Sequence, residues 1–186
     1  ALIISDSGGG PSSTVDIEEL GPSTIATTSM TVANDGSGTI DIDYTGEDVV
    51  DIDNGHVLHT STVDHPFSYT AIIGNLTDSG TFNAGGTAAF TTSAGGADIV
   101  LDELAVTGDI ALTTHGPMGH ATLVNAGGID FGASTVGGNL TATSTTGNLT
   151  DEQTVTVGGT AGFATSGGDA DIVLDELAVT GDIALT

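Results

Sequence analysis

The sequence predicts an all-β protein built as a β-solenoid, a parallel β-helix whose rungs stack on one another. Three observations predict this fold: a long internal repeat, short runs in which apolar and small polar residues alternate, and glycine-rich corners between the runs. Tandem β-sandwich domains are the alternative, because one such domain takes about 70–100 residues, a length comparable to the repeat. The solenoid is favoured because the short runs follow one another without a linker.

The long repeat lies in the second half of the chain. Asn75–Thr113 recurs as Asn148–Thr186 and defines a 73-residue repeat, with 30 of 39 aligned positions identical and the last 16 unbroken. We therefore expect residues 71–186 to form one repetitive β-strand region. Residues 1–70 differ, and we expect them to form a divergent β region or cap behind a flexible lead rich in Gly and Ser. Because the second copy stops where the first continues, we expect the sequence to be an excerpt of a longer one.

Strand-like runs occur inside this region about every ten residues, so that two runs make a unit near twenty. The runs begin after Gly86, Ala97, Gly108, Gly119, Gly128, Gly138 and Gly147. Apolar residues within them alternate with Thr, Ser or Asp, which is the period of a half-buried strand. We expect Ile110, Leu112, Leu140 and Leu149 to face inward. The Gly and Asn residues between runs allow the backbone to turn sharply.

The charge of the chain is entirely of one sign. It has 25 Asp and Glu residues, no Lys and no Arg, and a formal net charge of −25. Without basic side chains the chain has no electrostatic basis for binding nucleic acid or an anionic lipid surface. No apolar run approaches the roughly 20 residues that span a bilayer, so membrane insertion is not expected. The expected partners are cations, neutral glycans and other copies of the chain.

Catalysis is not expected. Parallel β-helix enzymes that act on acidic polysaccharides use Arg or Lys as the catalytic base and to bind the substrate carboxylates, and this chain has neither residue. The G-x-S-x-G motif of a serine nucleophile is absent. A carboxylate pair could hydrolyse a glycosidic bond, but Trp, the usual sugar platform, is missing as well.

Calcium is the metal that the composition favours, because hard cations prefer oxygen ligands. Six carboxylates lie close together in the sequence, and these are the candidate ligands: Asp41, Asp43, Glu47, Asp48, Asp51 and Asp53. The spacing of an EF-hand loop is absent. The alternative interpretation is a solvated acidic face that keeps the protein soluble.

Three Asn-Leu-Thr triplets, at Asn75, Asn139 and Asn148, are formal acceptors for N-glycosylation. The structural alternative is that Asn at a solenoid corner forms a hydrogen-bonded ladder from one rung to the next. Thr-rich runs such as Thr141–Thr143 are also typical of the flat threonine arrays of ice-binding solenoids. Outward positions are not consistently Thr in successive runs, however, which argues against that function.

Several phrases resemble the β-strand repeats of giant bacterial surface proteins of the filamentous-haemagglutinin type. Those repeats favour phrases of the forms N-A-G-x-D-F, V-G-G-x-x-T and G-x-D-I-x-L, and the segments that approach these forms here are NAGGIDF (Asn125–Phe131), VGGT (Val157–Thr160) and DADIVL (Asp169–Leu174). The resemblance covers roughly residues 75–186. It implies a right-handed β-helix, export to the cell surface, and a role in adhesion or the extracellular matrix.

Together these observations predict a non-catalytic structural or adhesive extracellular protein. It would form or extend a surface fibre by stacking of β repeats, since an open solenoid end exposes unpaired backbone groups. The alternative function is a calcium- or carbohydrate-binding stalk module made of β-sandwich domains.

Overall fold

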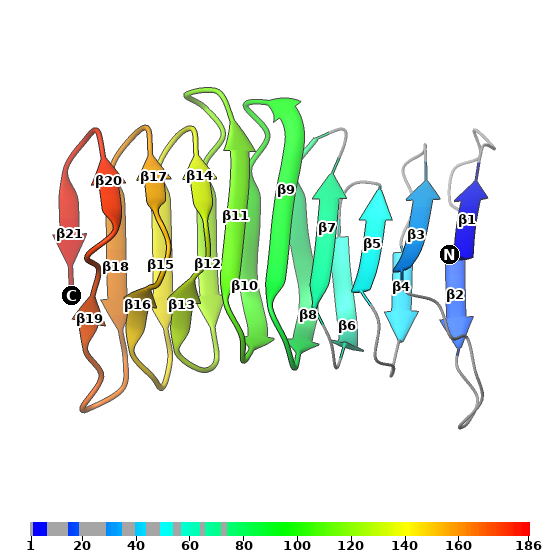
Figure 1. Ribbon diagram of the computed structural model, residues 1–186, viewed down its shortest axis with the longest axis horizontal. Coiled ribbons are helices and arrows are strands. Elements are labelled where there is room, and N and C mark those ends of the chain that lie inside the picture. Colours follow the sequence, from blue (N-terminus) through cyan, green and yellow to red (C-terminus); the bar gives the residue numbers. More distant parts are fainter. Residues whose placement is uncertain are drawn as a thin grey trace.

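The computed structural model describes the backbone of six strands between residues 2 and 63, and the backbone and side chains of residues 66–71 and 74–186. Every regular element in these residues is a β-strand, and every strand pair is parallel. Figure 1 shows two layers of strands that face each other, stacked rung upon rung along one axis. The β-solenoid prediction is confirmed. The tandem-sandwich alternative is wrong, because sandwich sheets are antiparallel.

The chain alternates between the two layers, and one rung consists of a strand position in each. The front sheet of Figure 1 contains 12 strands: β1 (Leu2–Asp6), β3 (Ser29–Asn34), β5 (Val49–Asp53), β7 (Phe67–Ala71), β9 (Ala88–Gly95), β11 (Ile110–His115), β13 (Ile129–Phe131), β14 (Ser134–Val136), β16 (Leu149–Asp151), β17 (Val155–Val157), β19 (Ile172–Val173) and β20 (Leu177–Val179). The back sheet contains nine: β2 (Val15–Glu18), β4 (Ile40–Asp43), β6 (Val57–Val63), β8 (Leu76–Ala84), β10 (Ile99–Val106), β12 (Ala121–Asn125), β15 (Leu140–Ser144), β18 (Ala161–Thr165) and β21 (Ile183–Leu185).

The core is a thin column of apolar side chains between the sheets. The four residues predicted to face inward, Ile110, Leu112, Leu140 and Leu149, are all buried to within 1% exposure. The burial of β12 alternates residue by residue, as the sequence pattern predicts. Each fully buried Leu, Ile or Phe contributes about 1.5–3 kcal/mol of hydrophobic stabilisation.

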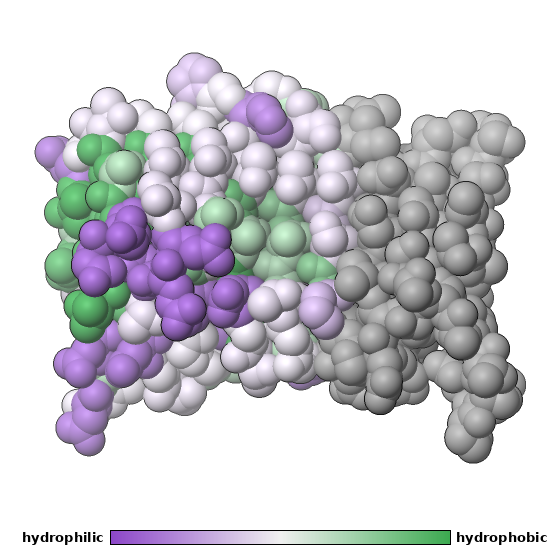
Figure 2. Space-filling model, viewed as in Figure 1, coloured by the Kyte–Doolittle hydropathy of each residue, from purple (hydrophilic) through white to green (hydrophobic). Residues whose placement is uncertain are grey.

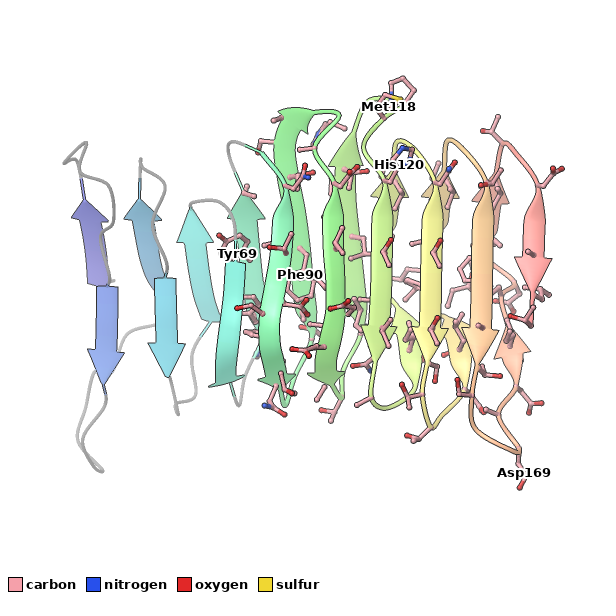
Figure 3. The ribbon with its side chains drawn as sticks, turned by 180° about the vertical axis from the view of Figure 1, so that it is seen from behind. Tyr69, Phe90, Met118, His120 and Asp169 are labelled. Atoms are coloured by element: carbon pink, nitrogen blue, oxygen red, sulfur yellow. The ribbon has the colours of Figure 1, made fainter. Side chains whose placement is uncertain are left out.

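Aromatic side chains pack together in two parts of the core. Phe67, Phe82 and Phe90 pack together with ring centroids 4.6 to 6.1 Å apart. Figure 3 labels Tyr69 and Phe90 on neighbouring strands of the front sheet. Phe131 and Phe163 form a second, edge-to-face pair at 6.1 Å. These pairs add about 0.5–1.5 kcal/mol each to the burial of their surface.

Glycine at the corners allows the rungs to approach one another. A Cβ on Gly108 would lie 2.6 Å from the carbonyl carbon of Gly86 in the preceding rung, so a larger residue would push the two rungs apart. Gly116, in the loop between β11 and β12, has φ +79°, a conformation that side chains other than Gly rarely adopt. This loop carries Met118, which is 65% exposed and lies at its tip in Figure 3.

The internal repeat does not contain a whole number of rungs. Asn75 precedes β8 in the back sheet, whereas its counterpart Asn148 precedes β16 in the front sheet. The repeat therefore spans seven strand positions, which make three and a half rungs. As a consequence, the identical segments 98–113 and 171–186 lie in opposite sheets: the first forms β10 and β11, and the second forms β19, β20 and β21.

Both copies of the repeat interrupt their strand pairing at corresponding residues. In the first copy, the register of β10 shifts between Leu101 and Leu104, at a bulge formed by Asp102 and Glu103. In the second copy, the counterparts of these residues separate β19 from β20. The strands before residue 70 pair in the same two sheets as those after it; for example, Val50 of β5 lies opposite Phe67 of β7.

Candidate functional site

One corner of the solenoid carries a ladder of hydrogen bonds that joins five rungs. Oδ1 of Asn75 accepts a hydrogen bond from the N–H of Asp98 at 2.9 Å, and Oδ1 of Asp98 accepts one from the N–H of His120 at 2.8 Å. Nδ1 of His120 then accepts from the N–H of Asn139 at 2.8 Å, which requires the tautomer protonated on Nε2. Oδ1 of Asn139 accepts from the N–H of Thr160 at 3.0 Å. Each side chain thus binds the backbone of the next rung.

The three glycosylation candidates all lie at such corners. Oδ1 of Asn148 accepts from the N–H of Asp171 at 3.0 Å, as Asn75 and Asn139 do on the other sheet. The predicted hydrogen-bonded ladder is therefore present. Asn75, Asn139 and Asn148 are all exposed, so the ladder leaves them accessible to solvent, and glycosylation stays a prediction.

A second polar motif, here named the carboxylate bracket, is repeated in both copies. The Asp78 carboxylate accepts hydrogen bonds from the N–H groups of Asp102 and Glu103, at 3.1 and 2.9 Å. Asp151, its counterpart in the second copy, accepts from the N–H groups of Asp175 and Glu176 at 2.8 and 3.1 Å. The first bracket binds the bulge of β10 and the second binds the break between β19 and β20; at both places the sheet leaves two backbone donors to be satisfied.

The two brackets differ in their surroundings. Asp151 is 7% exposed, whereas Asp78 is half-buried. Burial raises the pKa of the Asp78 carboxyl above its ordinary value, the backbone N–H groups of Glu103 and Asp102 oppose this rise, and the nearby Asp102 carboxylate adds to it. Sequence reasoning missed both brackets, although the recurrence of Asp in N-L-T-D was visible.

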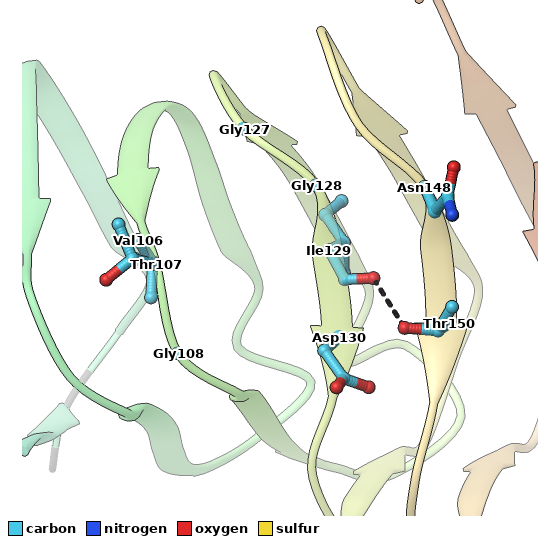
Figure 4. A pocket seen from close by; sticks show the side chains of 9 residues that line it. All are labelled: Val106, Thr107, Gly108, Gly127, Gly128, Ile129, Asp130, Asn148 and Thr150. Carbon is cyan, nitrogen blue, oxygen red and sulfur yellow. Dashed lines mark hydrogen bonds between the residues drawn. The ribbon is translucent and has the colours of Figure 1, made fainter. Parts of the chain in front are cut away.

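A groove of about 400 Å³ crosses three rungs at a corner of the front sheet (Figure 4). Its wall includes three glycines and four polar side chains: Gly108, Gly127, Gly128, Thr107, Asp130, Asn148 and Thr150. The hydroxyl of Thr150 donates a hydrogen bond to the carbonyl of Ile129 at 3.4 Å. Oδ1 of Asp130 is buried and accepts no hydrogen bond from the described residues.

The outer face of the front sheet carries a column of threonines. Strand register places one threonine opposite the next in five successive rungs: Thr70, Thr91, Thr113, Thr135 and Thr156. A column of small residues two positions earlier contributes Ala89, Ala111 and Ala133 to a shallow groove of about 300 Å³. The sequence did not reveal this column because the offsets between its members are not constant. One extra residue enters between β11 and β14, where Ile110 pairs with Phe131 but Thr113 pairs with Thr135.

Acidic side chains gather on the front sheet toward the C-terminal end (Figure 2), where Glu152, Asp175 and Glu176 are exposed. Among the residues that the structure describes, no group of three or more His, Cys, Asp or Glu side chains is arranged to hold a metal ion. The described part of the chain also lacks any helix capable of crossing a membrane.

The calcium candidates are distributed over two sheets. The backbone places Asp41 and Asp43 on β4 of the back sheet, and Asp51 and Asp53 on β5 of the front sheet. Glu47 and Asp48 lie outside the described residues. A calcium site at this cluster therefore stays a prediction.

The last rung presents apolar side chains that the same sequence buries elsewhere. Ile183 and Leu185 on β21 are 52% and 58% exposed, whereas their counterparts Ile110 and Leu112 on β11 are fully buried. Figure 2 shows these hydrophobic side chains gathered at one end of the molecule. The difference arises because β13 and β14 cover β11, and no described strand covers β21.

A family model described as repeats of unknown function, DUF5649, matches residues 45–113 and 118–186, which together make up most of the chain. The chain belongs to the DUF5649 repeat family. The two DUF5649 matches are offset by the same distance along the sequence as the two copies of the internal repeat. They are separated by residues 114–117, at the end of β11 and in the loop before β12. The first DUF5649 repeat begins at residue 45, well before Asn75. No curated protein and no solved structure matches the chain.

Proposed function

We propose that this DUF5649 protein is a non-catalytic structural element of an extracellular fibre or adhesin, which extends by stacking of β repeats. The observation that carries the proposal is the continuity of the solenoid across the two repeats. Strand β12 of the second repeat pairs directly with β10 of the first, so no linker or domain boundary interrupts the sheets. A protein built in this way gains length with each added repeat while its cross-section stays constant.

Several features support a location outside the cell. The chain has no Lys or Arg, so proteases of the trypsin type find no cleavage site in it. The resemblance of residues 75–186 to filamentous-haemagglutinin-type repeats points the same way. The corner ladder and the carboxylate brackets hold neighbouring rungs together by local hydrogen bonds, a property suited to a load-bearing fibre.

The test is an averaged power spectrum from electron micrographs of the native material. Rungs stacked along a fibre axis give a strong meridional reflection near 4.8 Å, the spacing between paired strands. A fibre without that reflection, or native material that contains only dispersed single molecules, would contradict the proposal.

Binding of a neutral glycan is the second candidate function, and the front-sheet groove of about 400 Å³ favours it. The groove combines hydroxyl, amide and carboxylate groups with glycine backbone, so it offers donors and acceptors to sugar hydroxyls without a basic residue. Titration with neutral oligosaccharides, followed by NMR, tests this function. Thr150→Val is expected to weaken binding several-fold, whereas Thr141→Val on the back sheet is the matched control. Equal binding by both variants would exclude the groove.

A further inference from the structure

We propose that the face formed by β19, β20 and β21 is a specific seat for the first rung of another DUF5649 repeat, which enters with its strands exchanged between the two sheets. This inference rests on the proposed function and names the partner of one surface. The partner is defined by its strand pattern: a short strand that enters the front sheet, followed by a longer, interrupted strand that enters the back sheet.

The chain already contains this interface once. Residues 98–113 and 171–186 are identical in sequence. In the first copy, β12 lies against β10, with Ile99 opposite Ala121 and Leu101 opposite Leu123. The other half of the rung, β13 and β14, lies against β11. The seat thus repeats, residue for residue, a surface that is covered elsewhere in the same molecule by the first rung of a repeat.

Polar contacts make the interface selective. The buried amide of Asn125 accepts a hydrogen bond from the N–H of Val106 at 2.8 Å and donates one to its carbonyl at 2.9 Å. Ser134 Oγ accepts a hydrogen bond from the N–H of Leu112 at 3.0 Å. An incoming rung with the sequence of the second DUF5649 repeat therefore supplies an amide and a hydroxyl at two buried backbone positions, which an arbitrary β-strand would not provide.

The seat carries the counterparts of the residues that receive these groups. Val179 corresponds to Val106, Leu185 to Leu112, and Asp171 to Asp98. In the first copy, Asp98 accepts a hydrogen bond from the N–H of His120, at the start of the incoming rung. The seat also carries an apolar surface: Ile183 and Leu185 are exposed, whereas their counterparts Ile110 and Leu112 are buried beneath the next rung.

The exchange between sheets follows from the odd number of strands. In the first junction the short strand β12 enters the back sheet, because β10 lies there; at the seat, the counterpart of β10 is β19 with β20, in the front sheet. A newly added repeat must therefore place its short strand in front. The Asp-Glu pair at the seat, Asp175 and Glu176, keeps on the other sheet the backbone hydrogen bonds that Asp102 and Glu103 make, as the two carboxylate brackets show.

The experiment fuses a second copy of residues 114–186 directly after Thr186 and follows amide hydrogen exchange in the monomeric protein. We expect the amides of Ile183, Ala184 and Leu185 to exchange on the order of 100-fold more slowly than in the parent chain, approaching the rates of residues 110–112. Two controls have matched length: a Gly/Ser extension, and the same fusion with the added counterparts of Asn125 and Ser134 replaced by Leu and Ala. Both controls should leave residues 183–185 substantially less protected.

Three outcomes overturn the inference: an added copy that folds while residues 183–185 stay unprotected, an added copy that does not fold, and equal protection by the fusion and by its Asn125/Ser134 variant. Because the measurement is made on monomers, it is separate from the micrographs that test the fibre. If residues 183–185 become protected but the native material forms no fibres, the seat is supported and the fibre proposal is refuted. If the native material forms fibres but residues 183–185 stay unprotected in the fusion, only the seat is refuted.

Discussion

The carboxylate bracket gives a direct test of how the rungs are held together. Asp151→Ala removes the acceptor of two backbone hydrogen bonds, at 2.8 and 3.1 Å, from a side chain that is only 7% exposed. A hydrogen bond to a charged group contributes about 1.5–3 kcal/mol when buried. Both donor residues, Asp175 and Glu176, are exposed, so water can partly replace the carboxylate and the expected loss falls to about 2–4 kcal/mol.

Amide hydrogen exchange at the two donors measures this loss. A local destabilisation of about 2–4 kcal/mol accelerates exchange by about 30- to 700-fold, at 1.4 kcal/mol for each factor of ten. Asp169→Ala is the matched control, because it removes the same charge from an exposed corner of the second repeat (Figure 3). The reasoning is refuted if Asp151→Ala and Asp169→Ala give the same exchange rates at residues 175 and 176.

Three further predictions concern glycine, pH and salt. Gly108→Ala should destabilise the protein by about 1–3 kcal/mol in chemical unfolding, because its Cβ would meet the backbone of Gly86, whereas Gly162→Ala, with open space around it, should change stability by less than about 1 kcal/mol. Because the folded-state pKa of Asp78 is raised, the stability that its protonated form contributes is lost as pH rises through that pKa. Lowering the pH should therefore increase the free energy of unfolding of the parent chain more than that of Asp78→Asn. Equal pH profiles of the free energy of unfolding would contradict this. Removing divalent cations or salt should loosen lateral bundles of fibres without unfolding them, because 25 like charges repel when unscreened; light scattering and circular dichroism together measure this, and fibres that dissolve into unfolded chains would indicate structural calcium instead.

Local pattern was sufficient to predict the fold class. Alternation of apolar and small polar residues identified Ile110, Leu112, Leu140 and Leu149 as core positions, and all four are buried. Glycine spacing placed the corners, because a rung can approach its neighbour closely only where no Cβ intervenes. Both signals depend on residues adjacent in sequence, which a single sequence shows directly.

Features that depend on register between rungs could not be predicted in the same way. The spacing along the chain between paired residues is not constant: it is shorter for Ala121 and Leu140 than for Leu76 and Ile99, so no fixed period aligns one rung with the next. The threonine column and the carboxylate brackets are therefore invisible in the sequence until strand pairing is known. The early part of the first DUF5649 repeat was missed for another reason: before Asn75 its identity to the second repeat is too low to recognise by inspection.

The odd number of strands in each repeat also constrains how such genes can change. Duplication or loss of a single repeat by recombination turns every surface feature downstream to the opposite side of the molecule, because the chain re-enters the other sheet. Gain or loss of two repeats at once restores the original orientation. If one side of the solenoid is under selection for contact with a partner, repeats should be inherited in pairs, and variants of one species should differ in length by an even number of repeats.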